Sequence, residues 1–322
     1  MFCPYQGKDV PDELATLEHV VPYSVGGSNA FTIKVSKDAN SRAGDEADCL
    51  LTNNFFIATE RIARGLKGQS GNAPSYKLRG TIEVEKGLSV DARYKVSSAS
   101  PELWMKPEVQ RSMSADGNEQ IRIACDLADL DRILADVNRK LSAQGKAPID
   151  KEAFIRTAKI VSNEQPQMKV EDSFGVLTFE QPFIKIALGT AHFALGEFFS
   201  RTADADLLRK AMWEPDGNAR LQLKLHGAVW PNVPNAEKFL NIMRREDHHI
   251  VAIANTGPMS AIIILFGQYL GMFKLSDDVH KYASKIGSGI AYVIDPDTRA
   301  LSTTSYHEHV TATLRAQLAA KK

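Results

Sequence analysis

Four polar side chains near the N-terminus have types and a spacing that favour metal-assisted chemistry. Glu18 and His19 are neighbours in the chain, and Asn40 and Asp48 follow after a Gly-Gly pair. Carboxylate and carboxamide oxygens are hard donors, and beside a neutral imidazole they suit Mg²⁺ or Mn²⁺ better than zinc. We therefore expect one divalent ion and one histidine to share a site built from these residues.

A β-hairpin followed by a helix would bring these side chains together. The first strand should end near His19, and the chain then turns through residues 24–29. Residues 30–35 alternate apolar and β-branched side chains, which is typical of a strand with one buried face. The polar stretch at residues 36–48 can open a helix. This β-β-α order predicts that Asn40 and Asp48 fold back onto the Glu18-His19 pair.

A resemblance to a known family rests on residues 18–48, which read EHVVPYSVGGSNAFTIKVSKDANSRAGDEAD. This run is similar to the HNH endonucleases, or ββα-metal nucleases, in the branch that joins E-H to a proline and a double glycine. The resemblance implies that His19 is the general base that activates water, since an imidazole titrates near neutral pH. It also implies that Glu18 and Asn40 hold the ion, which polarises the scissile phosphate and stabilises the departing 3′ oxygen. Asp48 falls at the third motif position, where metal binding, ligand orientation and a capping role all stay open.

The same comparison with the family predicts how the hairpin is held. Many relatives bind a structural zinc through two C-x-x-C pairs, but here those places are residues 3–6, CPYQ, and residues 36–39, SKDA. One of four thiols is present, so a tetrahedral structural zinc is not expected. Packing of apolar side chains should hold the motif instead, and the candidates are Phe31, Ile33, Val35, Leu50, Phe55 and Phe56.

Length and charge limit the range of functions. The chain has 322 residues, of which 43% are hydrophobic, so it can form more than one hydrophobic core, and two domains are the default expectation. The formal net charge is zero, so no global field attracts nucleic acid and any DNA binding needs a local basic patch. The candidates for that patch are Arg61, Arg64, Lys67, Lys77 and Arg79, each of which could equally be a solvated surface charge.

Cysteine usage and apolar runs bear on location. The three cysteines, Cys3, Cys49 and Cys125, have no paired spacing, so a disulfide framework is not expected. We expect a reducing, cytoplasmic setting instead. The N-terminal residues lack the basic and apolar regions of a secretory signal. The apolar run from Met259 to Phe273 is shorter than the roughly twenty residues of a membrane span and favours buried strands, so no membrane partner is expected.

The rest of the chain predicts an α+β fold. An N-terminal ββα-metal (HNH) module at residues 1–70 should precede a larger mixed region at residues 71–322, which could divide near residues 165–175. Apolar periodicity predicts helices at 50–66, 126–143, 183–199, 204–212 and 310–320. Alternating or continuous apolar runs predict strands at 80–84, 92–96, 121–125, 221–225, 249–254, 260–266, 270–275 and 289–294, with a hairpin turn at residues 86–87.

Other histidines do not form a recognisable site in the sequence. The clusters at residues 244–249 and 307–309 each lack a third ligand at an interpretable spacing, so we interpret them as polar strand ends or loops. His192 lies on an apolar helix face and is expected to be a core histidine. No G-x-S-x-G, G-x-x-x-x-G-K or paired C-x-x-C motif occurs.

Two functions follow from the motif. The first is a metal-dependent HNH endonuclease that hydrolyses phosphodiester bonds in DNA, with RNA left open. The second is a catalytically inactive HNH-like factor that binds nucleic acid or an unidentified protein, and the neutral charge and missing thiols favour it. A nuclease should gain thermal stability from Mn²⁺ through Glu18 and Asn40, whereas a scaffold should not.

Overall fold

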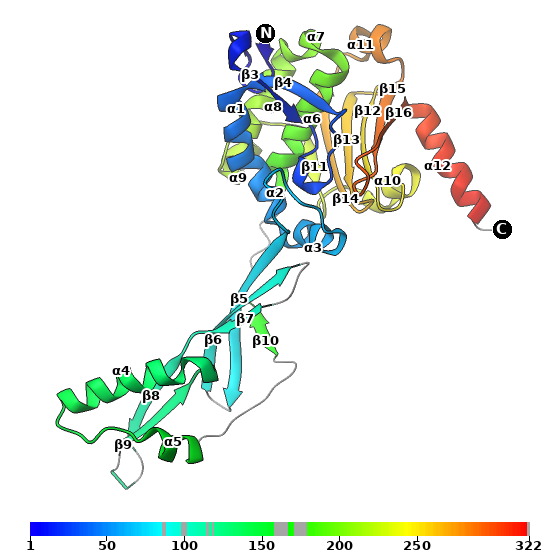
Figure 1. The fold of residues 1–322 in the computed structure, drawn as a ribbon. Helices are drawn as coiled ribbons and strands as arrows, with labels where there is room; N and C mark the ends of the chain where they lie inside the picture. Colours follow the sequence, from blue (N-terminus) through cyan, green and yellow to red (C-terminus); the bar gives the residue numbers. More distant parts are fainter. Residues whose placement is uncertain are drawn as a thin grey trace. The chain divides into compact units, whose positions relative to one another are not determined.

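A computed structural model describes residues 1–85, 88–97, 102–113, 116–117, 119–157, 167–170 and 179–320 (Figure 1). The fold mixes helices and strands, so the predicted α+β class is confirmed. The chain divides into two compact units, unit 1 (Met1–Pro74 with Phe174–Lys322) and unit 2 (Ser75–Ser173). This division differs from the predicted boundary at residue 70, because the N-terminal segment packs into one core with the C-terminal half.

The N-terminal segment of unit 1 forms the expected hairpin and helix. Its elements are β1 (Phe2–Cys3), β2 (Lys8–Asp9), η1 (Asp12–Leu14), β3 (Ala15–His19), η2 (Tyr23–Val25), β4 (Thr32–Ser36), α1 (Lys37–Ala43), η3 (Gly44–Asp48), α2 (Cys49–Thr52) and α3 (Phe55–Arg64). Strand β3 pairs antiparallel with β4, and His19 lies opposite Thr32. Helix α1 begins before Asn40, because the Ser36 side chain caps it by accepting a hydrogen bond from the Ala39 N–H.

The Gly-Gly pair is required by the turn between the two strands. Gly26 has a φ of +94°, and a Cβ there would lie 2.6 Å from the Pro296 Cβ. A Cβ on Gly27 would lie 1.8 Å from the carbonyl oxygen of Val21. Neither position accommodates a side chain without moving the backbone, so the pair fixes how the chain passes from β3 to β4.

A six-stranded antiparallel sheet forms the centre of unit 1. Its strands, in spatial order, are β11 (Gly227–Val229), β14 (Tyr269–Ser276), β13 (Met259–Leu265), β12 (His249–Ala254), β15 (Gly289–Ile294) and β16 (Leu301–Ser305). Every residue of β12 is buried, which explains its continuous apolar sequence. The predicted strands at 249–254, 260–266, 270–275 and 289–294 are therefore confirmed.

Helices cover both faces of this sheet. They are α6 (Glu180–Leu195), α7 (Glu197–Ser200), α8 (Ala203–Trp213), α9 (Gly217–Gln222), α10 (Ala236–Met243), α11 (Val279–Ile286) and α12 (Tyr306–Ala320). Helix α6 lies between the β3–β4 hairpin and one face of the sheet, whereas α10 and α12 pack on the other face (Figure 1). The strand predicted at 221–225 is wrong, because the Asp216 carboxylate caps a helix by accepting hydrogen bonds from the Asn218 and Ala219 amides.

One hydrophobic core joins the hairpin to α6 and the sheet. The Phe31 ring lies 4.8 Å from the Phe193 ring of α6 and 4.7 Å from the Tyr292 ring of β15, between centroids. Ile33 and Val35 of β4 are buried in the same core, as predicted for this strand face. The motif is thus positioned by the C-terminal half of the chain.

Unit 2 is built mainly from antiparallel strands. Its elements are β5 (Ser75–Glu85), β6 (Leu88–Ser97), β7 (Glu102–Met105), β8 (Glu108–Met113), β9 (Glu119–Ala124), η4 (Leu127–Asp129), α4 (Leu130–Ala143), α5 (Lys151–Thr157) and β10 (Met168–Val170). The strand order β10-β5-β6-β7 forms one sheet, and β8 pairs with β9. The predicted turn at residues 86–87 lies outside the described residues. In neither unit does a described helix have the length and apolar character needed to cross a membrane.

Candidate functional site

His19 is the last residue of β3, and its imidazole faces an open cavity of about 480 Å³. The ring Nε2 lies 2.9 Å from the Asn29 Oδ1, and the ring centroid lies 5.2 Å from that of Tyr23. The cavity is lined by His19, Tyr23, Asn29, Lys67, Gly68, Gln69, Gly71 and Arg299. A histidine that is oriented by a neighbouring carboxamide and reachable from solvent can act as a general base.

Two cations border this cavity. The Arg299 guanidinium stacks 3.6 Å from the Tyr23 ring centroid and donates hydrogen bonds to the carbonyl oxygens of Tyr23, Gly27 and Lys67. Within the described residues its hydrogen-bond partners are carbonyl groups, so no carboxylate neutralises its charge. Arg299 also has a φ of +60°, which is uncommon for a residue other than glycine. The exposed Lys67 adds a second positive charge, and the cavity therefore suits an anionic ligand.

Glu18 faces the opposite side of the hairpin from His19. Successive side chains of a strand alternate between its two faces, and the Glu18 residue is only 7% exposed. Its carboxylate forms an ion pair with the ammonium group of Lys185, which projects from α6. The structure therefore separates the Glu18 carboxylate from the His19 imidazole, although the two residues are adjacent in the chain.

Asp48 joins Glu18 at Lys185. Both Asp48 carboxylate oxygens lie 2.9 Å from the Lys185 Nζ, which also donates a hydrogen bond of 3.2 Å to the His19 carbonyl oxygen. Burial raises the pKa of Asp48 to about 6, and the nearby Glu18 adds to this shift, whereas Lys185 opposes it. Burial alone would lower the pKa of the fully buried Lys185, but the two carboxylates outweigh it and hold that pKa above its ordinary value.

Asn40 occupies a third position. Its side-chain amide donates a long hydrogen bond of 3.4 Å to the carbonyl oxygen of Leu17, which ties α1 to β3. Of the four predicted site residues, the structure brings Glu18 and Asp48 together around Lys185. It places the His19 imidazole in the cavity on the other face, and it places Asn40 against the strand backbone.

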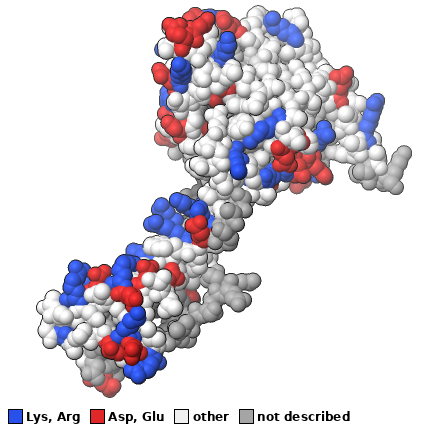
Figure 2. Space-filling view, viewed as in Figure 1, with Lys and Arg blue, Asp and Glu red and all other residues white. Residues whose placement is uncertain are grey.

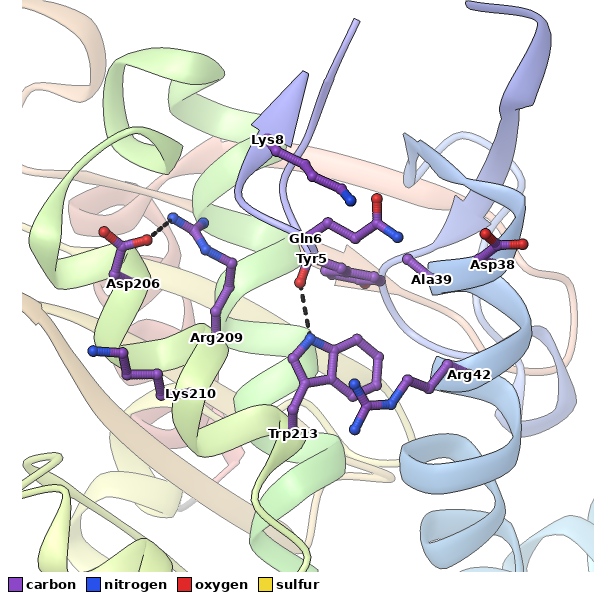
Figure 3. A pocket seen from close by; sticks show the side chains of 10 residues that line it. All are labelled: Tyr5, Gln6, Lys8, Asp38, Ala39, Arg42, Asp206, Arg209, Lys210 and Trp213. Atoms are coloured by element: carbon purple, nitrogen blue, oxygen red, sulfur yellow. Dashed lines mark hydrogen bonds and ion pairs between the residues drawn. The ribbon is translucent and has the colours of Figure 1, made fainter. Parts of the chain in front are cut away.

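The places of the family's zinc ligands also meet in space. The Ser36 N–H donates a 3.3 Å hydrogen bond to the Cys3 thiol, so the first positions of the two C-x-x-C places are in contact. Gln6 and Ala39, the last positions, line a second cavity of about 540 Å³, where the Gln6 side chain points toward Ala39 (Figure 3). The four positions present a thiol, a hydroxyl, a carboxamide and a methyl group.

This second cavity is lined by basic side chains and by the carboxylates of Asp38 and Asp206. The Arg42 guanidinium lies 4.1 Å from the Trp213 ring centroid, and the indole N–H donates a hydrogen bond of 2.8 Å to the Tyr5 carbonyl oxygen (Figure 3). Lys8 and Lys210 also line it. Tyr5 forms part of its wall and lies close to the Lys185 cluster, since its phenol interacts electrostatically with Lys185.

The predicted phosphate-binding cations have different environments. The Arg61 side chain donates hydrogen bonds to the carbonyl oxygens of Ser24 and Thr52, so it supports the fold. Arg64 is neutralised by ion pairs with Asp247, Asp297 and Glu60. Lys67 borders the His19 cavity, whereas Lys77 and Arg79 lie in unit 2.

Lys77 and Arg79 belong to a basic face of the unit 2 sheet. We define the β5–β7 basic face by Lys77, Arg79, Arg93, Lys95, Trp104 and Lys169, whose strand positions place them on one side. Arg79 lies directly opposite Arg93, and Arg93 lies opposite Trp104, with its guanidinium 5.2 Å from the ring centroid. Figure 2 shows Lys and Arg side chains gathered over this part of unit 2.

The buried His249 has a structural role. The Phe266 N–H donates a 3.0 Å hydrogen bond to its Nδ1, and its Nε2 donates one of 2.8 Å to the Val25 carbonyl oxygen, which ties β12 to the turn after His19. Burial lowers the pKa of His249 to about 4. The interpretation of residues 244–249 as strand-end polarity fits this residue. Likewise, His192 shares a 2.8 Å hydrogen bond with Ser200.

This environment predicts acid sensitivity. Between about pH 6.5 and 4 the unfolded chain protonates His249 and the folded chain does not, so stability is lost as the pH falls. Replacing His249 by glutamine should remove a pH-dependent loss on the order of 2 kcal/mol. Asp48 has the opposite sign because its folded pKa is raised. Urea unfolding of wild type and His249→Gln at pH 7 and pH 4.5 measures how much free energy of unfolding each protein loses between the two pH values. An equal loss in the two proteins would contradict this assignment.

Sequence reasoning missed Lys185, Arg299 and Trp213. Lys185 did give a signal, because it is the lone charge in the apolar run from Phe183 to Leu188, and such a buried lysine requires a carboxylate partner.

Searches of family models, curated proteins and solved structures found no match to this chain. The site must be interpreted from its own geometry and chemistry.

Proposed function

We propose that unit 1 is an HNH-type phosphodiester hydrolase that acts on DNA, with His19 as its general base. The observation that supports this most directly is the position of the His19 imidazole. It stands at the end of the first strand of a β3–β4–α1 unit and faces a solvent-open cavity bordered by Lys67 and Arg299. A phosphate group bound between these cations would lie beside the imidazole.

The chemistry assigned to His19 is a proton transfer. If its Nε2–H donates to the Asn29 Oδ1, the lone pair on Nδ1 can accept a proton from water. The water oxygen then forms a bond to phosphorus as the bond to the leaving 3′ oxygen breaks, and that oxygen takes a proton from solvent water in the open cavity. Lys67 and Arg299 would stabilise the negative charge that gathers on the phosphoryl oxygens.

Two further observations support the likeness to HNH nucleases. The order β3, β4 and α1 is the predicted one, with Asn40 in the helix. Cys3 and Ser36, the first positions of the two C-x-x-C places, are in contact, and Gln6 and Ala39, the last positions, line one cavity, which is consistent with the likeness. Both are features of the local fold, so they support the family proposal independently of the catalytic one.

A single Mg²⁺ or Mn²⁺ held by Glu18, Asn40 and Asp48 does not fit these residues as they are placed. Glu18 and Asp48 are ion-paired to Lys185, and the Asn40 amide faces the Leu17 carbonyl group. Glu18, Asn40 and Asp48 therefore do not form one metal site beside the His19 imidazole, and the part of a divalent ion stays a prediction.

Incubation of the purified full chain with supercoiled plasmid tests the proposed function. We expect relaxed and linear products from wild type, measured with Mg²⁺, with Mn²⁺ and with EDTA in parallel. Cleavage products in EDTA would show that the reaction needs no divalent ion. Products that form with Mg²⁺ or Mn²⁺ but not with EDTA would show that it needs one. Intact plasmid under all three conditions would refute the hydrolase proposal.

The second candidate is an HNH-like binding factor without catalysis. The Lys185 ammonium favours it, because an internal cation holds Glu18, which the resemblance assigns to the metal, and Asp48, which falls at the third motif position. Such a chain would bind DNA in an anisotropy assay and leave it uncut. Plasmid cleavage by wild type that His19→Ala abolishes would exclude it.

DNA binding is supported by the β5–β7 basic face as well. Like charges directly opposite each other in a sheet destabilise it, yet Arg79 faces Arg93. Lys77 also faces Lys95, but Lys95 forms an ion pair of 3.0 Å with Glu102 on the same face. A phosphate backbone would offset this repulsion. Trp104, which is 43% exposed, offers a surface on which a base can stack.

Removal of three cations from this face should weaken DNA binding and its salt dependence. For the variant Lys77→Ala/Arg79→Ala/Arg93→Ala, we expect the slope of log K against log salt to become less negative by about 3, since each lost phosphate contact contributes about 0.9 to its size. Fluorescence anisotropy of labelled duplex DNA measures this. A matched control replaces three cations on α4 of the same unit, namely Arg132, Arg139 and Lys140. Equal slopes for the two triple variants would contradict the assignment.

A further inference from the structure

Among the residues that the structure describes, the groups that pair with the Lys185 ammonium are all oxygen atoms, which together form a cage. The ammonium group contacts both Asp48 carboxylate oxygens at 2.9 Å, the His19 carbonyl oxygen at 3.2 Å and the Glu18 carboxylate. These groups come from β3 and the π-helical turn η3, while the lysine comes from α6. Two carboxylates and one carbonyl are also a ligand set that a hard divalent cation accepts. The Lys185 side chain is 0% exposed, so solvent does not reach the ammonium group.

A buried hydroxyl group, that of Tyr5, lies beside the cage and supports the inference that the cage could hold an ion in place of the lysine. Tyr5 is fully buried, and among the described residues none gives its hydroxyl a hydrogen-bond partner. The phenol interacts electrostatically with Lys185, Glu18 and Asp48. It also reaches α6, because a Cβ added to Gly189 would lie 3.3 Å from the Tyr5 Oη. Since buried polar groups almost always have a partner, a hydrated ion could supply the one that this hydroxyl lacks.

We propose that Lys185 is a built-in cation that fills this oxygen cage and excludes a divalent ion, and that shortening its side chain creates a divalent-cation site. The charges support both parts. The ammonium balances one of the two buried carboxylates, and without it the cage would hold two negative charges in a confined space, which a divalent ion neutralises. The inference does not depend on the proposed function, because a hydrolase and a binding factor could both use such a lysine to hold β3 against α6.

The variant Lys185→Ala tests the proposal, with Lys185→Met as the matched control that removes the charge but fills the space. Each full-length protein is titrated with Mn²⁺ by calorimetry and by the loss of the free-ion electron paramagnetic resonance signal, and melted with Mn²⁺ or EDTA. For Lys185→Ala we expect one bound Mn²⁺ and a rise in Tm of about 5 °C at saturation. Wild type and Lys185→Met should show no Mn²⁺ binding that Asp48→Asn removes, and no rise in Tm that depends on Asp48. Adding Asp48→Asn to Lys185→Ala should weaken Mn²⁺ binding at least about tenfold, because ligand charge sets affinity.

Several outcomes would overturn the proposal. The first is stoichiometric Mn²⁺ binding by wild type that Asp48→Asn abolishes, because the lysine would then not exclude the ion. The second is folded Lys185→Ala that binds no Mn²⁺. If Lys185→Ala is unfolded in EDTA, refolding on addition of Mn²⁺ supports the cage, and a chain that stays unfolded with Mn²⁺ and with Ca²⁺ counts against it. Plasmid cleavage is not among these measurements, so a failed hydrolase proposal would leave this result unaffected.

Discussion

Replacing His19 by alanine should reduce the rate of plasmid cleavage by about 10²- to 10⁴-fold, the usual contribution of a general base. His19 is the imidazole in the cavity that Lys67 and Arg299 border, so its loss removes the proton acceptor and leaves the cations in place. The fold should be unaffected, because the His19 side chain is partly exposed, and its main-chain carbonyl, which Lys185 contacts, is unchanged. Initial rates on supercoiled plasmid, with Tm measured on the same preparations, check both parts.

Two controls make this result specific. His307→Ala removes an exposed histidine of unit 1 that does not line the cavity, and it should cleave at the wild-type rate. Asn29→Ala removes the group that orients the imidazole, and its effect on the cleavage rate should be smaller than that of His19→Ala. Cleavage by a clean His19→Ala preparation at the wild-type rate would refute the assignment of His19 as the base.

The sequence predicted the local structure of the motif well because that information is local. The alternation of apolar residues predicted β4, and the Gly-Gly pair predicted the turn before it. The structure explains the pair, because the Gly27 backbone lies close to the Val21 carbonyl oxygen. Continuous apolar runs located the central strands because both faces of their sheet are covered by helices. The strand predicted at residues 221–225 was wrong, because the Asp216 side chain caps a helix that includes the first two of these residues.

The arrangement of the predicted site residues could not be obtained in the same way. Whether Glu18 meets a metal or a lysine depends on α6, which is far away in the chain and packs against the hairpin only in the folded core. The adjacency of Glu18 and His19 suggested one site, but strand alternation places their side chains on opposite faces. The predicted divisions at residue 70 and near residues 165–175 lie close to the ends of unit 2, but the sequence did not indicate that the segments on either side of it join in one core.

Replacing Lys185 by methionine should destabilise the protein by about 3 to 5 kcal/mol, the range seen when one partner of a buried ion pair is removed. Methionine keeps most of the side-chain volume, so the loss comes mainly from leaving Glu18 and Asp48 buried without a cation. Burial already raises the pKa of Asp48, and loss of the ammonium group should raise it further, so the remaining stability is present at low pH and is lost as the pH rises through that value. Urea unfolding at pH 5 and pH 8 measures both effects.

Neutralising the carboxylates should reverse this loss. In Lys185→Met/Glu18→Gln/Asp48→Asn the cage contains no charge, and we expect at least half of the lost free energy of unfolding to return, with little difference between pH 5 and pH 8. A Lys185→Met protein that loses less than about 1 kcal/mol would show that the ion pairs hold little of the fold together. A triple variant no more stable than Lys185→Met would show that packing of the lysine stem, rather than its charge, joins the hairpin to α6.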